Sequence, residues 1–408
     1  MNYVQITKCR TCFSDHLFEI LDLGFQPLAN ALKDNSSDKG EKKYPLRLVQ
    51  CGDCSLVQID VNVKPELMFS NYNWVTGTSQ SSMEHCENFA RRTLQIFEYF
   101  PKSVLEVGSN DGTLLKAFLH KKVKLLVGVD PAENLAREYG TGIFAENAYF
   151  DSINAGKIQD KYGKFDVIIA RNVFSHVPDF SDVISGVSKL TDSDSIFLME
   201  FHWAHDILLN LHYDSIYHEH TYYHSISSVS SVLKNYDLEI FDAFRSPISG
   251  GSVVVAASRN PKPVTPELMR MREFESISRI SDYQSWEEFG KKAQGNLEQI
   301  ASVIDSYSGK RICAFGASAR SSTILNAIGG HASKILSVAE NNPRKWGKFS
   351  PGIGLPIESV ENMLSRKPDL IILFPFNFKD EIIDQLVRLG WSGSLLLPIP
   401  HPPQLIEV

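Results

Sequence analysis

The sequence predicts an α/β protein in which a small cysteine-rich domain precedes two doubly wound, Rossmann-like units. Three observations point to this fold class. Two Cys-x-x-Cys pairs lie among short strand-like runs near the N-terminus, apolar strands alternate with helical patterns over residues 86–258, and the order of strand, glycine turn and helix returns after residue 309. A chain of 408 residues is too long for one hydrophobic core, so several domains are expected.

Changes of pattern set the expected domain boundaries. We expect a first domain over residues 1–85, a central, mostly parallel sheet over 86–258, a helical linker over 259–308 and a C-terminal domain over 309–408. The linker begins after a proline-punctuated turn and is amphipathic and rich in charge. C-terminal strands are predicted at residues 335–339, 370–374 and 394–397.

Composition and charge exclude several classes of partner. The net charge is −7 and the pI is near 6.0, so the chain lacks the basic surface that nucleic acids or anionic membranes select. No apolar run reaches 18 residues, and the polar start lacks the charged and apolar regions of a signal peptide. We therefore expect a cytoplasmic protein that binds neither nucleic acid nor membrane. Composition predicts no oligomeric state.

Four cysteines form two turn-prone knuckles, Cys9 with Cys12 and Cys51 with Cys54. Two such knuckles place four thiolates on a tetrahedron, the geometry of structural zinc, and four sulfur ligands leave no open position for catalysis. Disulfides are the alternative, but no secretion signal supports them, and a redox pair is disfavoured because two knuckles occur together. Cys86 and Cys313 are expected to be small buried apolar side chains.

A strand, a glycine turn and a helix follow one another over residues 103–118 and predict a nucleotide-binding edge. Gly108 and Gly112 let the backbone approach a ligand closely, although the turn is not the dinucleotide fingerprint. Glu106 lies just before the turn, and Asp130 ends the next strand, where a carboxylate can accept both ribose hydroxyls. These acids suit a cationic, ribose-bearing ligand. The alternative is an ordinary glycine turn in a parallel α/β domain.

The densest polar cluster spans residues 213–224, soon after a strand predicted at 196–200. Titratable side chains at the carboxyl ends of parallel strands can supply a base and an enolate stabiliser. A metal site is the competing interpretation, since His218 and His220 would share one side of an extended chain, but no third ligand follows at a familiar spacing. The remaining alternative is an aromatic loop that only covers the sheet. His176, beyond another predicted strand, is expected to line the same crevice.

Several motifs follow one another along nearly the whole chain: the two Cys-x-x-Cys pairs, Glu-Val-Gly-Ser-Asn-Asp-Gly, Asn-Val-Phe-Ser-His-Val-Pro-Asp, Ile-Tyr-His-Glu-His, Gly-Gly-Ser and Gly-Ala-Ser-Ala-Arg. Their joint order resembles the nucleotide-sugar C-methyltransferases that make branched-chain deoxysugars. The resemblance implies a zinc-binding domain, a central domain that binds S-adenosylmethionine (SAM) and a C-terminal Rossmann-like domain, with a nucleoside-diphosphate keto sugar between them. The implied SAM contacts, in a site similar to that of class I methyltransferases, are Glu106, Gly108, Asn110, Gly112, Asp130 and Asn172.

The resemblance also implies catalytic roles. A carbon next to a ketone becomes a nucleophile only after a base removes its proton, and the resulting enolate then attacks the methyl group of SAM in line. His220 matches the family's base, and an imidazole with an ordinary pKa of about 6.5 suits that work near neutral pH. Tyr217 and Glu219 match partners that bind the sugar and tune His220, and His176 matches a further active-site histidine.

Two departures from the family concern the sugar. Of the family's Tyr-x-Tyr stretch only the first tyrosine, Tyr72, is kept, and Thr76 begins the small polar residues that follow. Both are expected to contact the substrate. Ser249 stands where the family has a histidine before Gly-Gly-Ser. These changes leave the expected fold and donor intact and bear on the identity of the sugar and of the methylated carbon.

In the C-terminal unit, Ser318 and Arg320 are expected to contact the diphosphate at a helix N-terminus, and the alternative is a unit kept for packing alone. Two rival functions remain. An O- or N-methyltransferase for another small metabolite would need no carbon acid and would exchange no substrate proton with solvent. A non-catalytic protein that binds SAM or a nucleotide sugar would release no S-adenosylhomocysteine.

Overall fold

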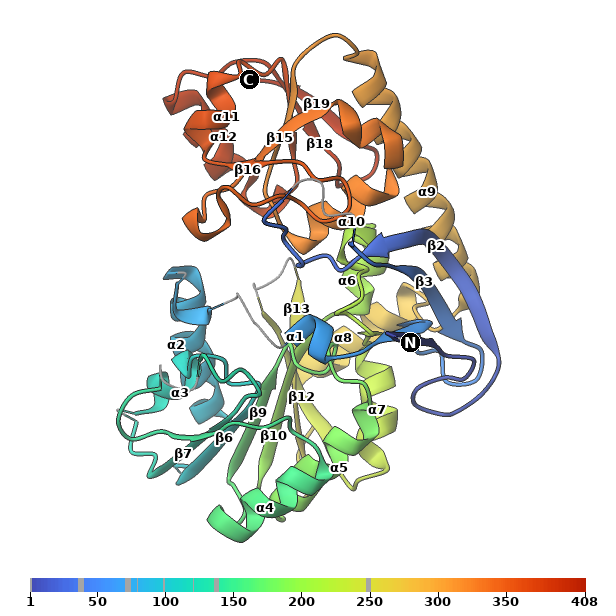
Figure 1. The fold of residues 1–408 in the computed structure, drawn as a ribbon. Coiled ribbons are helices and arrows are strands. Elements are labelled where there is room, and N and C mark those ends of the chain that lie inside the picture. The colour runs from blue at the N-terminus through green and yellow to red at the C-terminus, as the bar shows by residue number, and fades with distance from the viewer. Residues whose placement is uncertain are drawn as a thin grey trace.

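The computed structural model describes residues 2–35, 40–69, 75–78, 80–97, 100–119, 121–135, 139–246 and 251–408. Figure 1 shows a large twisted sheet below and a second sheet with the C-terminus above. Strands β2 (Leu17–Pro27) and β3 (Lys43–Cys51) and the long helix α9 (Tyr283–Ser306) run along one side of both. The predicted fold class is confirmed. No helix in the described ranges is long and apolar enough to cross a bilayer.

In the described residues the central sheet has seven strands in the order β12-β13-β10-β9-β6-β7-β8. Neighbours from β10 to β8 are parallel, and β13 runs antiparallel to β10 and β12. The strands are β6 (Ser103–Val107), β7 (Leu125–Val129), β8 (Phe144–Glu146), β9 (Val167–Arg171), β10 (Ile196–His202), β12 (Glu239–Ser246) and β13 (Ser252–Ser258). The inner strands are apolar runs because both faces are covered.

Alternate residues of each strand enter two separate cores. On β9, Ile168 and Ala170 pack with α4 and α5, whereas Val167 and Ile169 pack with α2 and α3. Aspartates at the N-caps of α4 and α5 accept main-chain N–H groups of the first turn, which fixes where these helices start. The helices around this sheet are α2 (Gln80–Gln95), α3 (Thr113–Phe118), α4 (Ser152–Tyr162), α5 (Phe180–Leu190), α6 (Ala204–Leu209), α7 (Ile226–Lys234) and α8 (Pro266–Ile277).

The N-terminal part is an antiparallel sheet in the order β11-β4-β3-β2, beside a ribbon of β1 (Tyr3–Gln5) and β5 (Val61–Val63). Its edge strand β11 (Tyr222–Tyr223) comes from the polar cluster of the central part and pairs with β4 (Val57–Ile59). The cysteine-rich sheet therefore holds one end of the segment that contains His220.

The C-terminal sheet has the order β16-β15-β14-β17-β18-β19, parallel except for β19. Its elements are β14 (Ile312–Phe315), α10 (Ala319–Ala327), β15 (Ile335–Ala339), β16 (Ile357–Glu358), α11 (Val360–Ser365), β17 (Leu370–Leu373), α12 (Lys379–Arg388), β18 (Ser394–Leu397) and β19 (Gln404–Glu407). Helix α9 crosses β2 so closely that a Cβ at Gly290 would lie 1.9 Å from the carbonyl oxygen of Ile20. Only glycine fits at this position, so α9 packs directly on β2 of the N-terminal sheet.

Candidate active site

The four predicted zinc ligands come together. The Sγ atoms of Cys9, Cys12, Cys51 and Cys54 all lie within 4.8 Å of one another, with Cys9 to Cys54 and Cys12 to Cys51 each at 3.5 Å. Sulfurs that share a tetrahedral zinc, each about 2.3 Å from the metal, have a similar separation. Gln58 Nε2 donates a hydrogen bond to Cys9 Sγ at 3.3 Å, which favours a thiolate. The donor set fits structural zinc and leaves no open position.

The glycine turn after β6 is a rigid edge. Gly108 has φ +67°, and a Cβ there would lie 2.4 Å from Val173 Cγ2. Asp130, at the end of β7, accepts main-chain N–H groups from Asn110 at 2.8 Å and from Ala132 at 2.9 Å. Burial raises the pKa of Asp130. The carboxylate expected to meet the ribose is therefore fixed by the backbone before any ligand arrives.

Thr76 is hydrogen-bonded to this turn. The Oδ1 atom of Asn110 accepts the N–H of Thr76 at 2.9 Å and its hydroxyl at 3.2 Å, and the N–H of Gly77 donates to Asp111 Oδ2 at 3.0 Å. The role of Thr76 in substrate binding stays a prediction. Tyr72 and Ser249 lie outside the described residues.

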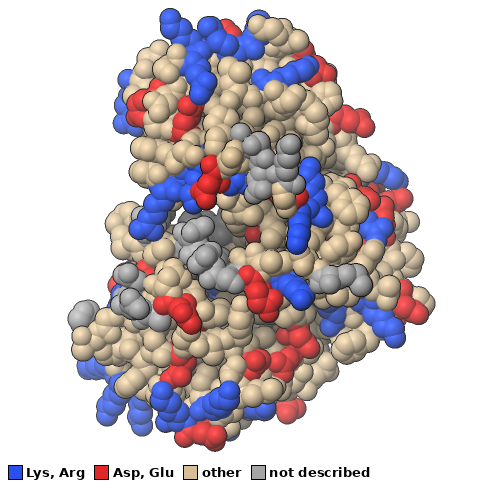
Figure 2. All heavy atoms as spheres, in the orientation of Figure 1, with Lys and Arg blue, Asp and Glu red and all other residues tan. Residues whose placement is uncertain are grey.

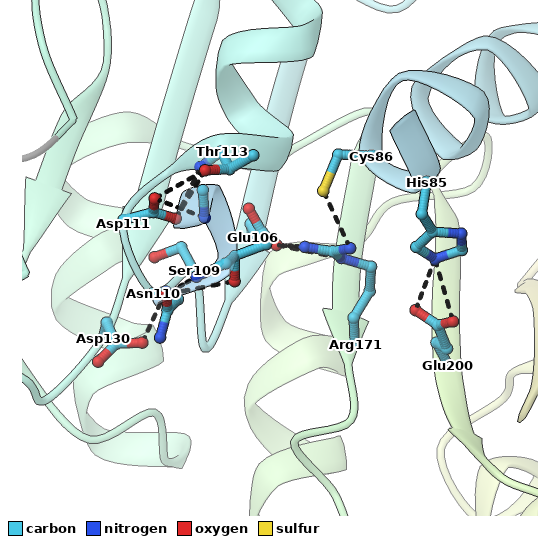
Figure 3. Close-up of polar contacts among 12 residues, drawn as sticks. His85, Cys86, Glu106, Ser109, Asn110, Asp111, Thr113, Asp130, Arg171 and Glu200 are labelled. Carbon is cyan, nitrogen blue, oxygen red and sulfur yellow. Dashed lines mark hydrogen bonds and ion pairs between the residues drawn. The ribbon is translucent and has the colours of Figure 1, made fainter. Parts of the chain in front are cut away.

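Two buried acceptors on neighbouring strands have no hydrogen-bond partner within the described residues. They are Oε2 of Glu106 on β6 and Oδ1 of Asn172, just after β9. The other oxygen of Glu106 accepts from Arg171, as Figure 3 shows. Burial raises the pKa of Glu106 to about 7, although Arg171 opposes this shift. Unfilled buried acceptors are costly unless a ligand supplies donors, so this pair suits an ammonium group.

Three imidazoles meet where β9 and β10 end. The ring centre of His220 lies 5.0 Å from that of His176 and 5.2 Å from that of His202, which meets it edge-on at 86°. Nδ1 of His220 faces the carbonyl oxygen of Ser215 at 3.0 Å and must donate to it, so the neutral ring accepts at Nε2 the hydroxyl of Tyr217 at 2.8 Å. Within the described residues only the four cysteines bring three or more ligand atoms together, so the histidines form no metal site there.

The expectation of an ordinary pKa for His220 is wrong. Burial, with the neighbouring His176, His202 and Arg320, lowers the pKa of His220 well below its usual value. Burial also lowers the pKa of His176 to about 4 and that of His202 to about 3. The cluster is neutral at pH 7. The segment is a turn and not an extended chain, so His218 points away and donates from Nε2 to the carbonyl oxygen of Pro45 at 3.2 Å.

Glu219 contacts a histidine through its backbone. Nδ1 of His176 donates to the carbonyl oxygen of Glu219 at 2.6 Å. The carboxyl group of Glu219 turns toward Asn30 of the first domain, and burial raises its pKa to about 7. Its Oε2 has no partner in the described part of the chain. The carboxyl group is thus placed beside the first domain, away from the ring of His220 that it was expected to tune.

Helix α10 of the C-terminal unit contacts the segment just before Tyr217. Arg320, on α10, lies 3.5 Å from the buried Asp214, and Thr323 donates to the carbonyl oxygen of Ile216 at 3.1 Å. Ser318 is the N-cap of α10, and its hydroxyl accepts the N–H of Ser321 at 3.3 Å. Both Ser318 and Arg320 therefore have partners within the protein, and their contact with a diphosphate stays a prediction. Figure 2 shows a hollow between the two lobes with Lys and Arg side chains on its upper rim.

Sequence reasoning missed several residues of this region. His202 and Arg171 end strands β10 and β9, so the strand-end rule that singled out Asp130 would have found them. Glu200, two residues before His202 on β10, is paired with His85 of α2. No local signal marks His85, because only the docking of α2 brings it to the sheet.

The edge of the central sheet is suited to a ligand with ribose hydroxyls at one end and an ammonium group at the other, which is the chemistry of SAM. A parallel sheet whose one antiparallel strand lies between β10 and β12 is the architecture of the class I SAM-dependent methyltransferases. The protein belongs to that class.

Comparisons with known proteins narrow the class. Family models match residues 9–69 ("Putative zinc binding domain"), 83–243 ("Methyltransferase domain") and 247–400 ("C-methyltransferase C-terminal domain"). C-methyltransferase NovU from Streptomyces niveus is 29% identical over 97% of this chain and 96% of its own. Together these matches identify the chain as a SAM-dependent C-methyltransferase with a zinc-binding domain.

Solved methyltransferase structures align with less of the chain. A SAM-dependent methyltransferase from Clostridium acetobutylicum covers 44% of this chain and 92% of its own at 14% identity and a TM-score of 0.36. Magnesium protoporphyrin IX methyltransferase from Synechocystis, with bound SAM, covers 44% and 79% at 17% identity and a TM-score of 0.34. The assignment depends on the family models and the full-length relative, not on these partial alignments.

Proposed function

We propose that the enzyme methylates a carbon next to the ketone of a nucleoside-diphosphate keto-deoxysugar, with His220 as the general base. The observation that carries this proposal is the hydrogen bond from the Tyr217 hydroxyl to Nε2 of His220 at the end of the SAM-binding sheet. A carbon acid needs such a base, whereas many oxygen and nitrogen acceptors are nucleophiles already.

The order of the strands supports the proposed orientation of SAM along the edge of the central sheet. In this proposal the ribose meets Asp130 at β7, and the ammonium group meets Glu106 and Asn172 between β6 and β9. SAM supplies an electrophilic methyl group. Strand β10 is the next neighbour of β9, and His202 at its end contacts His220. The histidines therefore lie beyond the methionine end of the donor, where the methyl acceptor is needed.

The hydrogen bonds also support a path for the proton. Tyr217 is half-buried and His220 is 6% exposed, and the Tyr217 hydroxyl binds Nε2, so in this proposal His220 acts as the base through Tyr217. The phenolic oxygen takes the proton from the substrate carbon while its own proton moves to Nε2. The substrate is left as an enolate and His220 as an imidazolium. The low pKa of His220 opposes this transfer, and the negative charge that develops on the adjacent enolate offsets the opposition.

The test is proton exchange without methylation. Keto-deoxysugars linked to uridine or thymidine diphosphate are incubated in deuterated water with S-adenosylhomocysteine. The wild-type enzyme should exchange the carbon-bound proton, and His220→Asn should lose both exchange and SAM-dependent methylation by roughly 10²- to 10⁴-fold while still binding S-adenosylhomocysteine.

His218→Asn is the matched control, because this histidine lies on the same turn and points away from the crevice. Near wild-type methylation by His220→Asn would place the base elsewhere. Methylation of a substrate without any exchange would favour an oxygen or nitrogen acceptor.

A further inference from the structure

Arg171 lies between the SAM edge and helix α2, with its donors directed to both, as Figure 3 shows. Its Nε and Nη2 donate to Oε1 of Glu106 at 3.4 and 3.2 Å, and its Nη1 donates to Sγ of Cys86 at 3.3 Å. The ring of Phe89 lies 5.7 Å from the guanidinium carbon. The Arg171 side chain is 13% exposed and that of Glu106 is 1% exposed. The contact is thus a buried ion pair and not a surface one.

A buried arginine beside the site of a cationic ligand requires an explanation. A guanidinium repels both the sulfonium and the ammonium group of SAM, and a buried ion pair adds little stability by itself. Arg171, however, contacts only Oε1 of Glu106, which leaves Oε2 without a partner within the described residues. The ion pair of Arg171 and Glu106 therefore leaves Oε2 of Glu106 available to a ligand.

Arg171 also favours the charged form of Glu106. Burial alone favours the protonated form of Glu106, and the other charged groups near it, Asp111 in the turn and Asp130 at the end of β7, act in the same direction. Arg171 on β9 opposes all three effects. Even with Arg171 present the pKa of Glu106 is about 7, and loss of the guanidinium would shift the carboxyl group further toward its neutral form. A neutral carboxyl is a much weaker partner for an ammonium group.

Helix α2 holds the arginine in place. Next to Cys86 in the sequence, His85 lies 3.2 Å from Oε1 of Glu200, and the hydroxyl of Ser246 also binds that carboxylate. Glu200 is paired with Arg171 in the parallel register of β9 and β10. The consecutive residues His85 and Cys86 of α2 therefore contact the ends of the neighbouring strands β10 and β9. These contacts hold the Arg171 side chain toward Glu106.

We propose that Arg171 is a positioning residue for the donor: it holds the Glu106 carboxylate turned so that Oε2 meets the ammonium group of SAM, while α2 fixes Arg171 through Cys86. The proposal depends on Glu106 being the ammonium contact. It does not depend on the sugar, on His220 or on the proton path, so it is tested by donor binding alone.

The experiment compares two ligands that differ by the amino-acid tail. S-Adenosylhomocysteine carries the ammonium group, and 5′-methylthioadenosine keeps the adenosine and the sulfur but lacks the tail. In Arg171→Met, we expect calorimetry to show affinity for S-adenosylhomocysteine reduced roughly 10- to 100-fold, and affinity for 5′-methylthioadenosine changed less than about twofold. Unchanged binding of the short ligand also shows that the site is folded.

Two further variants sharpen the result. Arg171→Lys keeps the positive charge but loses the planar guanidinium that reaches Glu106 and Cys86 together. Its affinity for S-adenosylhomocysteine should therefore fall less than that of Arg171→Met. Arg259→Met is the matched control, because Arg259 donates to the carbonyl oxygen of Ser188 at the opposite edge of the same sheet. Equal weakening of both ligands in Arg171→Met would mean that Arg171 acts only on the fold. Undiminished binding of S-adenosylhomocysteine would mean that the contact plays no part in recognition. Either result overturns the proposal.

Discussion

Two strand, turn and helix units of this chain are alike in their local geometry. In the central unit, Asp130 at the end of β7 accepts the N–H of Asn110 in the turn at 2.8 Å. In the C-terminal unit, Glu340 at the end of β15 accepts the N–H of Ala317 at 3.2 Å. Each carboxylate also accepts the N–H of the residue two positions further along the chain.

The two units differ in what surrounds the turn. Around the C-terminal turn, Lys345 binds Glu340 at 3.2 Å and the carbonyl oxygen of Ala317 at 2.8 Å, and Ser318 caps its own helix. Around the central turn, Glu106 and Asn172 each keep a buried acceptor without a partner in the described residues. The difference teaches that the same turn and the same acid can have different hydrogen-bond surroundings, so local geometry alone does not predict which buried acceptors stay unfilled.

The largest expected effect comes from removing the metal that supports the central unit. Cys54→Ser should lose zinc and unfold the first domain, because structural zinc provides much of the folding energy of such a domain. Strand β11 pairs with β4, so the segment that carries His220 should lose its anchor and methylation should be abolished. The C-terminal sheet should stay protected from hydrogen exchange. Elemental analysis that finds no zinc in the wild-type protein would contradict the assignment.

The next effect separates the two acids. Asp130→Ala should weaken S-adenosylhomocysteine binding roughly 10- to 150-fold, since its charge-assisted contact with the ribose should contribute about 1.5–3 kcal/mol. Glu340→Ala should leave that affinity unchanged and lower the melting temperature instead, because Lys345 and the turn lose their partner. Calorimetry and thermal unfolding on both variants check this. Equal loss of affinity in the two variants would show that the units share the donor.

We expect acid to unfold the central unit at a higher pH than the C-terminal unit. Burial holds the pKa of four histidines at about 3 to 4, namely His176, His202, His218 and His224. Below pH 6.5 these histidines take up protons in the unfolded chain but not in the folded one. The stability that the folded protein gains from keeping them neutral is therefore lost as the pH falls through 6.5 toward 4. Glu106 and Glu219, with pKa values raised to about 7, take up protons in the folded state and offset part of the loss.

The net effect should be a melting temperature lower by about 5 °C at pH 5.5 than at pH 7.5, with hydrogen exchange rising in the central sheet before the C-terminal one. The zinc content is measured at both pH values as a control. A melting temperature that rises on acidification would show that the two carboxyl groups outweigh the histidines.

The smallest effect concerns Ser318. Loss of its capping hydroxyl in Ser318→Ala should cost about 1 kcal/mol of stability. If the hydroxyl only caps α10, the affinities for uridine and thymidine diphosphates should stay unchanged. A loss of affinity of tenfold or more for either nucleotide would support the predicted diphosphate contact and would make the two turns more alike than their internal hydrogen bonds indicate.

Local sequence by itself determined the fold class and the zinc ligands. Apolar runs that alternate with helical patterns have few solutions other than a covered parallel sheet, and the three C-terminal strands predicted at residues 335–339, 370–374 and 394–397 lie where the structure has β15, β17 and β18. The zinc ligands could also be predicted from local sequence, because the spacing within each Cys-x-x-Cys knuckle fixes the positions of its two thiolates. The glycine turn and Asp130 were visible because they lie at strand ends.

Tertiary structure decided everything that depends on partners distant in the sequence. The pKa of His220 is lowered first by burial and then by His176, His202 and Arg320, which three separate segments of the chain bring around it. The engagement of Ser318 and the contacts of Arg171 with α2 depend on how whole elements dock. Sequence spacing encodes geometry within a turn, but burial and unfilled hydrogen bonds arise only when elements distant in the sequence pack against one another.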